Sequence, residues 1–231
     1  TDRIGTWGDD EPTYYISATP SFKPHLNSNT LRVLSPDGTE KVRFTPEEFD
    51  RVLEFSETEY SYAGQTTFQG HLLRANSLAR INLTTEFGTP CADRYLARFR
   101  GAFGNPAHAI LFFDLCRGIE LVFAMERAME LLADDLDYMD PDVPYTPRDG
   151  IGYGLVEAPR GPLIHRYVIE NGLIADAQFI IPTVHNMKAI ERALRVVGKR
   201  YISPAGINLE LEKAVGRVVR AFDPCIACAT Q

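Results

Sequence analysis

Apolar residues recur with two different periods along the 231-residue chain, and each period predicts one kind of element. Residues 31–44 alternate apolar and polar positions around a Pro-Asp-Gly turn, which predicts a β-hairpin. Residues 161–181 contain two β-rich runs joined by Asn171-Gly172, a dipeptide typical of two-residue hairpin turns. Strands are therefore expected in two well-separated parts of the chain.

Three- and four-residue steps between apolar positions predict one helix much longer than the others. We expect Asn105 to cap it and Pro106 to lie in its first turn, and about 28 residues would make it ~42 Å long. The apolar run within it carries Asp114 and Glu120, each suited either to pairing with an arginine or to carrying a proton. The run therefore predicts a buried helix of a soluble protein and not a membrane span, which needs ~18 or more apolar residues.

Capping residues mark the start of three shorter helices. A Thr-Pro-Glu-Glu capping box at Thr45 opens the first, within residues 45–55. Asn186 is expected to cap the second helix, in residues 186–199. Asn208 is expected to cap the third, which leads directly into the cysteines near the carboxyl terminus.

Two segments show neither the alternation typical of strands nor the three- and four-residue steps typical of helices. Residues 1–30 are rich in Pro, Gly, Asn, Thr and Tyr and are expected to form an extended, irregular arm, while residues 140–154 form a Pro/Gly/Asp-rich linker. We treat residues 31–231 as the carboxyl-terminal part of one domain. The predicted fold class is α+β and predominantly helical, with a long central helix and a small β-layer near residues 160–182.

Composition and charge narrow the possible partners. The net charge of -7, with 45% hydrophobic and 24% charged residues, is that of an ordinary globular protein and argues against nucleic acid or an anionic membrane as a partner. Four cysteines are too few for a disulfide scaffold in a chain of this length. We therefore expect a reducing, cytoplasmic setting, with any membrane attachment made through partners.

A Cys-x-x-Cys pair, Cys225 and Cys228, lies just before the carboxyl terminus. Cysteines at this spacing can place both sulfurs on one side of a tight turn, within reach of one metal ion. The spacing alone leaves open a structural zinc half-site, a redox dithiol, a catalytic metal and chance. Zinc normally takes four protein ligands, and the sequence has no second such pair. If a metal binds, this chain brings half of its ligands.

Two other segments can carry chemistry. Pro159 and Pro162 stiffen the backbone around Arg160, which would hold its guanidinium at a fixed place, although a surface arginine at a strand entry is the simpler interpretation. Pro182 ends an apolar strand and exposes the hydroxyl and amide of Thr183, although a strand end followed by a helix explains this pattern equally well.

Together the three segments resemble the large subunit of nickel–iron hydrogenases, most closely the cytoplasmic, cofactor-reducing branch. The order is Glu-Ala-Pro-Arg-Gly-x₃-His, then Pro-Thr-x₂-Asn, then a helix into Asp-Pro-Cys-x₂-Cys. Residues 78–83, Leu-Ala-Arg-Ile-Asn-Leu, are similar to the family's Pro-Leu-Ala-Arg-x-Asn segment, with Ser77 in place of Pro. The family's other cysteine pair, in an early Arg-x-Cys-x-x-Cys segment, is absent from this sequence.

The resemblance implies a heterobimetallic centre whose iron carries CO and cyanide. Cys225 would be a terminal nickel ligand and Cys228 a thiolate that bridges nickel and iron. Arg160 would hold its guanidinium over the open coordination position where H₂ binds. Thr183 would donate a hydrogen bond to a cyanide, and Pro182 would shape the dry pocket around the diatomic ligands.

The resemblance also implies roles nearer the terminus. A magnesium or iron ion would be bound by the backbone carbonyl of Phe179 and by Gln231, which stands where the family usually has histidine. The terminus itself would be produced by a protease after the metal is loaded. His165 matches a family histidine, although a structural role in a strand is the simpler interpretation.

The resemblance predicts an enzyme: part of the catalytic subunit of a nickel–iron hydrogenase, which splits H₂ reversibly and heterolytically into protons and electrons. The electrons would pass to iron–sulfur clusters on a small subunit. The missing cysteine pair implies either a split large subunit, completed by a partner chain, or a truncated product. The alternatives are a non-catalytic scaffold subunit of a hydrogenase-related respiratory complex and a zinc-binding interaction module.

Overall fold

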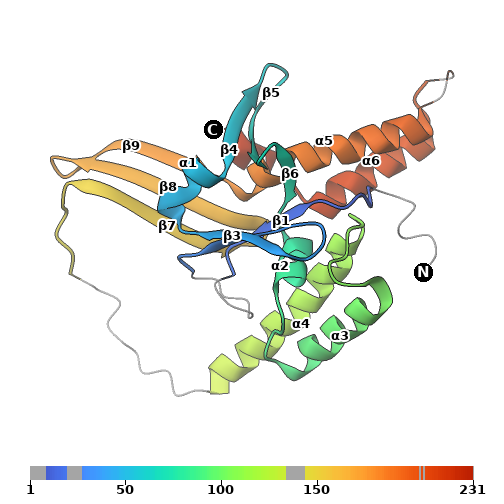
Figure 1. The fold of residues 1–231 in the computed structure, drawn as a ribbon, viewed down its shortest axis with the longest axis horizontal. Coiled ribbons are helices and arrows are strands. Elements are labelled where there is room, and N and C mark those ends of the chain that lie inside the picture. The colour runs from blue at the N-terminus through green and yellow to red at the C-terminus, as the bar shows by residue number, and fades with distance from the viewer. Residues whose placement is uncertain (1–8, 20–27, 134–143, 203, 205, 231) are drawn as a thin grey trace.

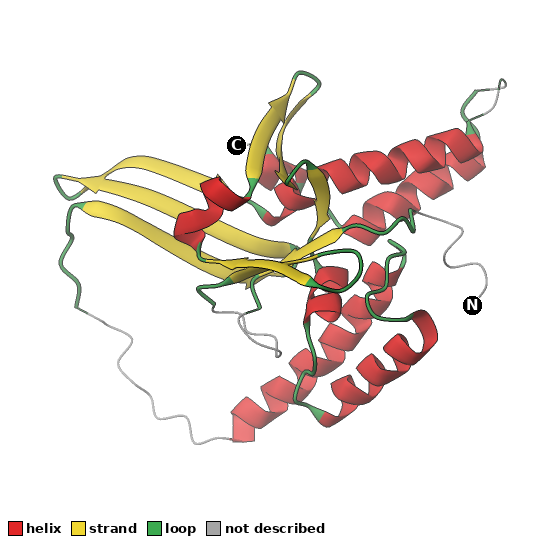
Figure 2. Cartoon of the chain, in the orientation of Figure 1, coloured by secondary structure: helices red, strands yellow, loops and turns green. Residues whose placement is uncertain are grey.

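The computed structural model of the chain describes residues 9–19, 28–133, 144–202, 204 and 206–230. Seven α-helices and two β-sheets among these residues form an α+β fold (Figure 1), with helices and strands coloured separately in Figure 2. The predicted fold class is confirmed. The β-structure is larger than the small layer that we predicted, because a six-stranded sheet accompanies the expected strands near residues 160–182.

The six-stranded sheet has the order β3-β2-β1-β6-β5-β4 and is antiparallel except for the pair β1 and β6. The predicted hairpin of residues 31–44 is confirmed, and Gly38 supplies the positive φ of its turn, +86°. The strands are β1 (Tyr14–Ser17), β2 (Leu31–Leu34), β3 (Glu40–Phe44), β4 (Glu54–Thr58), β5 (Ser61–Phe68) and β6 (His71–Arg74).

Strand β1 lies within the segment expected to be an irregular arm, yet it is an inner strand of the sheet. Its alternating side chains enter two separate hydrophobic clusters: Tyr15 packs with the helices, and Ile16 packs between the two sheets. A four-residue strand that is buried on both faces carries no alternation of polar and apolar positions, so the sequence pattern did not reveal it.

The second sheet has the order β7-β8-β9 and contains β7 (Gly150–Ala158), β8 (Gly161–Glu170) and β9 (Leu173–Ile180). The predicted turn at Asn171-Gly172 is confirmed, since both residues have positive φ, 53° and 74°. Strand β7 begins inside the predicted linker, whose residues 140–143 lie outside the described residues. Pairing with β8 along its whole length gives this glycine-rich strand its backbone partners.

Four of the helices form two pairs in Figure 1, with α5 and α6 side by side and α3 and α4 packed together below them. None of the described helices combines the length and apolarity needed to cross a bilayer. Their bounds, with one 3-10 helix, are η1 (Pro46–Glu48), α1 (Phe49–Val52), α2 (Ser77–Leu83), α3 (Pro90–Phe103), α4 (Phe112–Ala133), α5 (Pro182–Tyr201), α6 (Leu209–Phe222) and α7 (Ile226–Ala229).

The predicted caps at Asn105 and Asn186 are wrong. Helix α4 begins at Phe112, because the backbone of Ala107 is hydrogen-bonded to a side chain instead of to a helical turn. The Asn82 side chain accepts from the N–H of Ala107 at 3.0 Å and donates to its C=O at 2.9 Å. Helix α5 begins at Pro182, four residues before Asn186. The capping box at Thr45 and the cap at Asn208 are confirmed.

Helix α4 is not the buried helix that its apolar run predicted. Its buried residues are confined to the first turns, at Phe112, Phe113, Cys116 and Ile119. Beyond them the helix extends past the body of the described structure (Figure 1), and Leu132 is 80% exposed. An apolar run can pack inside a chain or between chains, and the pattern alone does not distinguish the two.

Candidate metal site

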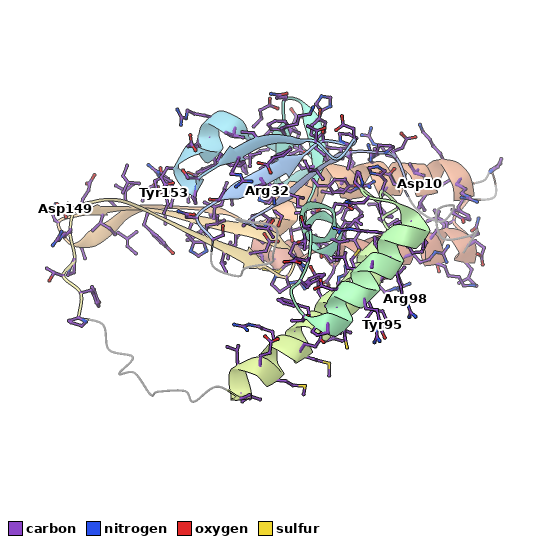
Figure 3. The ribbon with its side chains drawn as sticks, turned by 60° about the horizontal axis from the view of Figure 1, so that its bottom comes forward. Asp10, Arg32, Tyr95, Arg98, Asp149 and Tyr153 are labelled. Atoms are coloured by element: carbon purple, nitrogen blue, oxygen red, sulfur yellow. A yellow bond between two sulfur atoms is a disulfide. The ribbon has the colours of Figure 1, made fainter. Side chains whose placement is uncertain are left out.

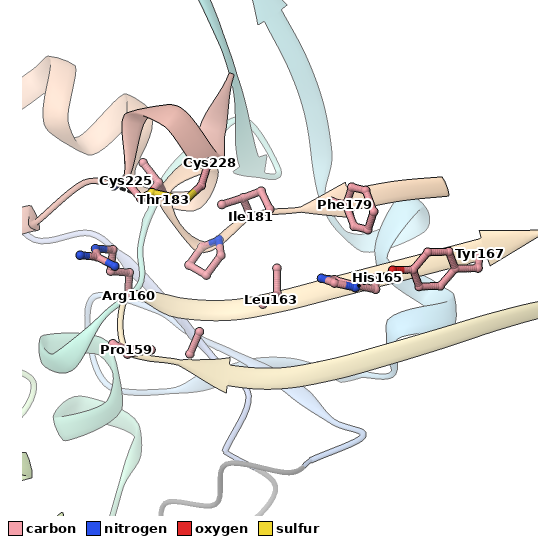
Figure 4. Close-up of a pocket in the computed structure, with 12 residues that line it drawn as sticks. Pro159, Arg160, Leu163, His165, Tyr167, Phe179, Ile181, Thr183, Cys225 and Cys228 are labelled. Carbon is pink, nitrogen blue, oxygen red and sulfur yellow. Dashed lines mark hydrogen bonds between the residues drawn. A yellow bond between two sulfur atoms is a disulfide. The ribbon is translucent and has the colours of Figure 1, made fainter. Parts of the chain in front are cut away.

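The predicted site residues that the structure describes meet at one pocket of about 400 Å³, where the end of β9, the β7–β8 turn and the carboxyl-terminal helix converge. Figure 4 shows Arg160 and the two cysteines at one end of this pocket and His165, Tyr167 and Phe179 at the other. The lining residues are Ala158, Pro159, Arg160, Leu163, His165, Tyr167, Phe179, Ile181, Pro182, Thr183, Cys225 and Cys228.

The sulfur atoms of Cys225 and Cys228 are bonded to each other in this structure. Cys225 is the N-cap of α7 and Cys228 lies in that single turn, which brings their Cα atoms within 5.3 Å. A disulfide has no thiolate to offer, so the expected metal ligation requires the pair to be reduced. The two sulfurs do converge on one point of the pocket wall, as a shared metal requires.

The described residues bring only part of a ligand set. No three His, Cys, Asp or Glu side chains among them come together as a metal site. Two soft sulfurs, a nearby cation and an otherwise largely apolar lining suit a thiolate-bound transition metal whose other ligands come from elsewhere. The donor chemistry therefore fits a nickel–iron group with half of its protein ligands supplied here.

Arg160 is fixed to the segment that carries the cysteines. Its Nε donates to the backbone carbonyl of Asp223, and its guanidinium lies 3.0 Å from the Asp223 carboxylate. Asp223 is the left-handed residue that ends α6, with φ of 49°, and it directs the chain toward Cys225. Both ends of this ion pair therefore lie next to the cysteine turn.

Thr183 contacts the same turn from α5. Its hydroxyl oxygen accepts a hydrogen bond from the backbone N–H of Cys225 at 3.1 Å. Because a hydroxyl can both accept and donate, its hydrogen stays available to a ligand in the pocket. The side chain is 1% exposed, so a hydrogen bond made there would be shielded from water.

The backbone that carries Arg160 is held by a buried ion-pair network. Arg80 of α2 donates to the backbone carbonyls of Ala158 at 3.1 Å and Pro159 at 2.9 Å. The same guanidinium pairs with Glu157 at 2.8 Å and with Glu120 of α4 at 2.5 Å. Burial raises the pKa of Glu157, although the charge of Arg80 opposes this shift.

Close packing also fixes where β8 starts. Gly161 has a φ of +130°, and a Cβ at this position would lie 2.6 Å from the Cβ of Ala75. Asn186 closes the same region, accepting from the backbone N–H of Ala75 at 2.8 Å and donating to the backbone carbonyl of Arg160 at 3.5 Å. The glycine of the Arg-Gly pair is therefore required by the close approach of two backbone segments.

The far end of the pocket is aromatic. His165 and Phe179 are paired across β8 and β9, with ring centroids 4.7 Å apart, and the Nδ1 atom of His165 lies 3.1 Å from the Tyr167 hydroxyl. Phe179 lines the pocket, and the binding of an ion by its backbone carbonyl stays a prediction. Gln231, the other expected ligand of a magnesium or iron ion, lies outside the described residues.

His185, which lies two residues after Thr183 on α5, is fully buried, and burial lowers its pKa to about 4. Its Nδ1 lies 2.8 Å from the Thr66 hydroxyl. As the pH falls, the unfolded chain would bind a proton at this histidine near pH 6.5, whereas the folded chain would bind it only near pH 4. The stability that depends on neutral His185 is therefore complete above pH 6.5 and is lost as the pH falls toward 4.

We expect the free energy of unfolding to fall by about 2 kcal/mol between pH 7 and pH 5 because of His185 alone. The measurement is urea unfolding of the chain and of a His185→Phe variant at both pH values. The variant should show a pH dependence smaller by that amount. Equal pH dependence in the two proteins would show that His185 does not titrate as its burial requires.

Several residues of the site were not assigned from the sequence: Arg80, Glu157, Asn186 and Asp223. All four lie in the segments that carried the resemblance, but none had a predicted role at this pocket. Glu120 had two possible roles, and its pairing with Arg80 is the one found. The second such residue, Asp114, pairs with Arg117 at 2.5 Å.

The pocket brings together a sulfur pair, an arginine paired with Asp223 and a buried threonine, and sequence comparison identifies the family. The model of the nickel-dependent hydrogenase family matches residues 23–231. This chain belongs to that family.

Relatives agree with this assignment. The vhu F420-non-reducing hydrogenase of Methanocaldococcus jannaschii has a matching subunit that is 38% identical over 190 residues, covering 79% of this chain and 46% of that protein. The beta subunit of NAD-reducing hydrogenase HoxS of Cupriavidus necator is 33% identical over 188 residues, covering 78% of this chain and 38% of that protein. The chain thus spans about half the length of the curated relatives it matches, or less.

Solved hydrogenase structures also match the whole of this chain with about half of their own length. The H₂-reduced crystal structure of an NAD⁺-reducing NiFe hydrogenase superposes with a TM-score of 0.90 at 26% identity, covering 100% of this chain and 53% of that one. The NiFeSe hydrogenase of Dm. baculatum superposes with a TM-score of 0.64 at 18% identity, which shows a shared fold alone. The better superposition on the NAD⁺-reducing enzyme agrees with the resemblance to the cofactor-reducing branch.

Proposed function

We propose that this chain is the part of a nickel–iron hydrogenase catalytic subunit that supplies Cys225 and Cys228 to the metal centre. The observation that carries the proposal is the single pocket in which both sulfurs, Arg160, Pro182 and Thr183 meet. These residues come from three separate segments of the chain. The remaining two thiolates come from a second polypeptide or from chain outside this sequence, because Cys91 and Cys116 do not line the pocket.

Cys225 and Cys228 would hold a nickel–iron group with CO and cyanide on its iron, and this group would supply the redox chemistry that splits H₂ into protons and electrons. The chain's own residues arrange the surroundings. The Arg160 guanidinium is a cation and, paired with Asp223, would face charge that develops in the pocket. Thr183 offers its hydroxyl hydrogen as a donor to a cyanide, while Pro182 and Ile181 exclude water beside it.

Electrons would leave through iron–sulfur clusters on a small subunit, since this chain has no further cysteine pair to hold one. The Phe179 carbonyl and Gln231 would bind a magnesium or iron ion. A cytoplasmic location completes the proposal. Neither a zinc module nor a non-catalytic scaffold needs an arginine anchored beside the sulfur pair.

Metal analysis tests this proposal. The complex is purified from its source organism without oxygen and with a thiol reductant, and nickel, iron and zinc are measured together with the infrared bands of metal-bound CO and cyanide. We expect about one nickel per chain and the infrared bands. Stoichiometric zinc without nickel would support the zinc-binding module, and absence of metal from the complex would support the scaffold.

Arg160→Lys should lower H₂ oxidation by at least about 100-fold while nickel content stays unchanged, because lysine cannot reproduce the planar fork that pairs with Asp223. Hydrogen-dependent dye reduction by the purified complex measures the effect. Arg166→Lys is the matched control, since Arg166 lies on the same sheet and also pairs with an aspartate, Asp176 at 2.8 Å, away from the pocket. Equal turnover in both variants would show that Arg160 has no role in catalysis.

A further inference from the structure

Helix α4 carries an apolar seam that the described residues leave uncovered. Its members recur at steps of three and four residues, the spacing at which one helix packs along another. Met125 is 60% exposed, Met129 70% and Leu132 80%, so exposure increases toward the end of the helix. The α4 seam consists of Leu115, Gly118, Val122, Met125, Met129 and Leu132.

The first half of the seam opens into an apolar groove of about 350 Å³ between α3 and α4. Leu115, Gly118 and Val122 form one wall, and Phe99 and Phe103 of α3 belong to the other. Gly118 has open space where a Cβ would lie, which lets a second helix approach α4 closely. Groove and seam together make one continuous surface, and a helix is the element that fits its spacing.

The border of the groove is basic. Arg98 and Tyr95 project from the outer side of α3 in Figure 3, and both line the groove. Among the described residues Arg98 has no carboxylate partner, whereas Arg127 on the other side of α4 pairs with Glu130. A helix seated in the groove would therefore match it best with an apolar stripe and an acidic residue facing Arg98.

The length of the similar enzyme indicates what covers this surface. The NAD⁺-reducing hydrogenase contains about as much chain again, since all of this chain covers 53% of it. The proposed function requires the same missing part to bring two thiolates to the pocket. Helix α4 is also linked to the pocket, because Glu120 holds Arg80, which in turn holds the carbonyls before Arg160.

We propose that the α4 seam and groove receive an amphipathic helix of the hydrogenase large-subunit region that this chain does not match. This inference rests on the proposed function and specifies where the partner docks. Docking there covers an apolar surface that soluble proteins rarely leave exposed. It also fixes α4, and through Glu120 and Arg80 the turn that carries Arg160.

A double variant, Met125→Glu with Met129→Glu, tests the docking surface in the complex as purified. We expect the copurified partner to fall by at least about tenfold per chain, because two carboxylates would enter an apolar interface. The thermal midpoint of the isolated chain should not change, since both side chains are exposed. Leu209→Glu is the matched control, because Leu209 on α6 is 61% exposed and lies off the seam. Full partner content in the double variant would overturn the proposal.

A photo-crosslinking residue at position 125 identifies the occupant, with position 127 on the far side of α4 as the control. We expect a crosslinked peptide from the unmatched large-subunit region at position 125 and none at position 127. A peptide from a second copy of this chain, a peptide from the iron–sulfur subunit, or no crosslink would overturn the proposal. Nickel in a complex without the expected crosslink would refute the docking surface alone, and the crosslink in a complex without nickel would refute the metal site alone.

Discussion

Replacement of Cys225 or Cys228 with serine is expected to remove nickel from the purified complex and to lower H₂ oxidation by more than about 100-fold. Loss of an outer-shell partner of a metal ligand already costs about 10–100-fold, and here a ligand itself is lost. Serine cannot replace it, because its hydroxyl is a hard ligand that stays protonated near neutral pH. Nickel content and hydrogen-dependent dye reduction measure the two effects.

Because the two sulfurs are bonded to each other in this structure, the complex must be prepared under reducing conditions before metal binding is tested. With reductant and without oxygen, thiol titration of the denatured metal-free chain should find four thiols, against two if the pair stays oxidised. Cys116→Ala is the control, because Cys116 is buried in the helical core, away from the pocket. If nickel and turnover survive in either serine variant, the cysteine pair is not a ligand pair.

Arg80→Met is expected to destabilise the chain by about 3–5 kcal/mol. The change leaves Glu157, which is 4% exposed, without the cation that balances its charge, and loss of one partner of a buried ion pair typically costs this much. It also leaves the carbonyls of Ala158 and Pro159 without their donor. Urea unfolding of the full chain measures the difference.

Two further variants separate charge from packing in this network. Arg80→Met combined with Glu157→Leu should recover part of the lost stability, because the buried charge of Glu157 is then removed, while Glu120 and the backbone N–H of Ala18 still lack their partners. Arg51→Met, which breaks the exposed pair with Glu48, should change stability by less than about 1 kcal/mol. If Arg80→Met is no more destabilising than Arg51→Met, the network does not hold the Arg160 turn.

Local signals in the sequence were sufficient where a turn or cap decides the structure. Asn171-Gly172 adopts the positive φ angles that its hairpin requires, and Asn208 caps α6 through its side chain. Asn105 and Asn186 have the same chemistry, but tertiary partners override the local preference. At the first, Asn82 holds the backbone of Ala107, and at the second the side chain itself binds Ala75.

The pocket was predictable only in part, for a related reason. Arg160, Thr183 and the cysteines lie in short motifs whose order is visible along the chain. The residues that hold them in place act across long separations: Arg80 reaches Glu157, 77 positions away, and Arg160 reaches Asp223, 63 positions away. The periodicity of apolar positions along a sequence does not indicate such long-range pairings. The exposure of α4 could not be predicted from the sequence either, because an apolar run has the same pattern whether the same chain or another chain covers it.

X-ray absorption at the nickel edge, on the reduced complex, tests the central claim most directly. We expect sulfur atoms in the first coordination shell of nickel, and one sulfur fewer in whatever nickel the Cys225→Ser variant retains. An unchanged sulfur count in that variant, or a nickel shell without sulfur in the unmodified complex, would contradict the assignment of the carboxyl-terminal cysteines to the metal centre.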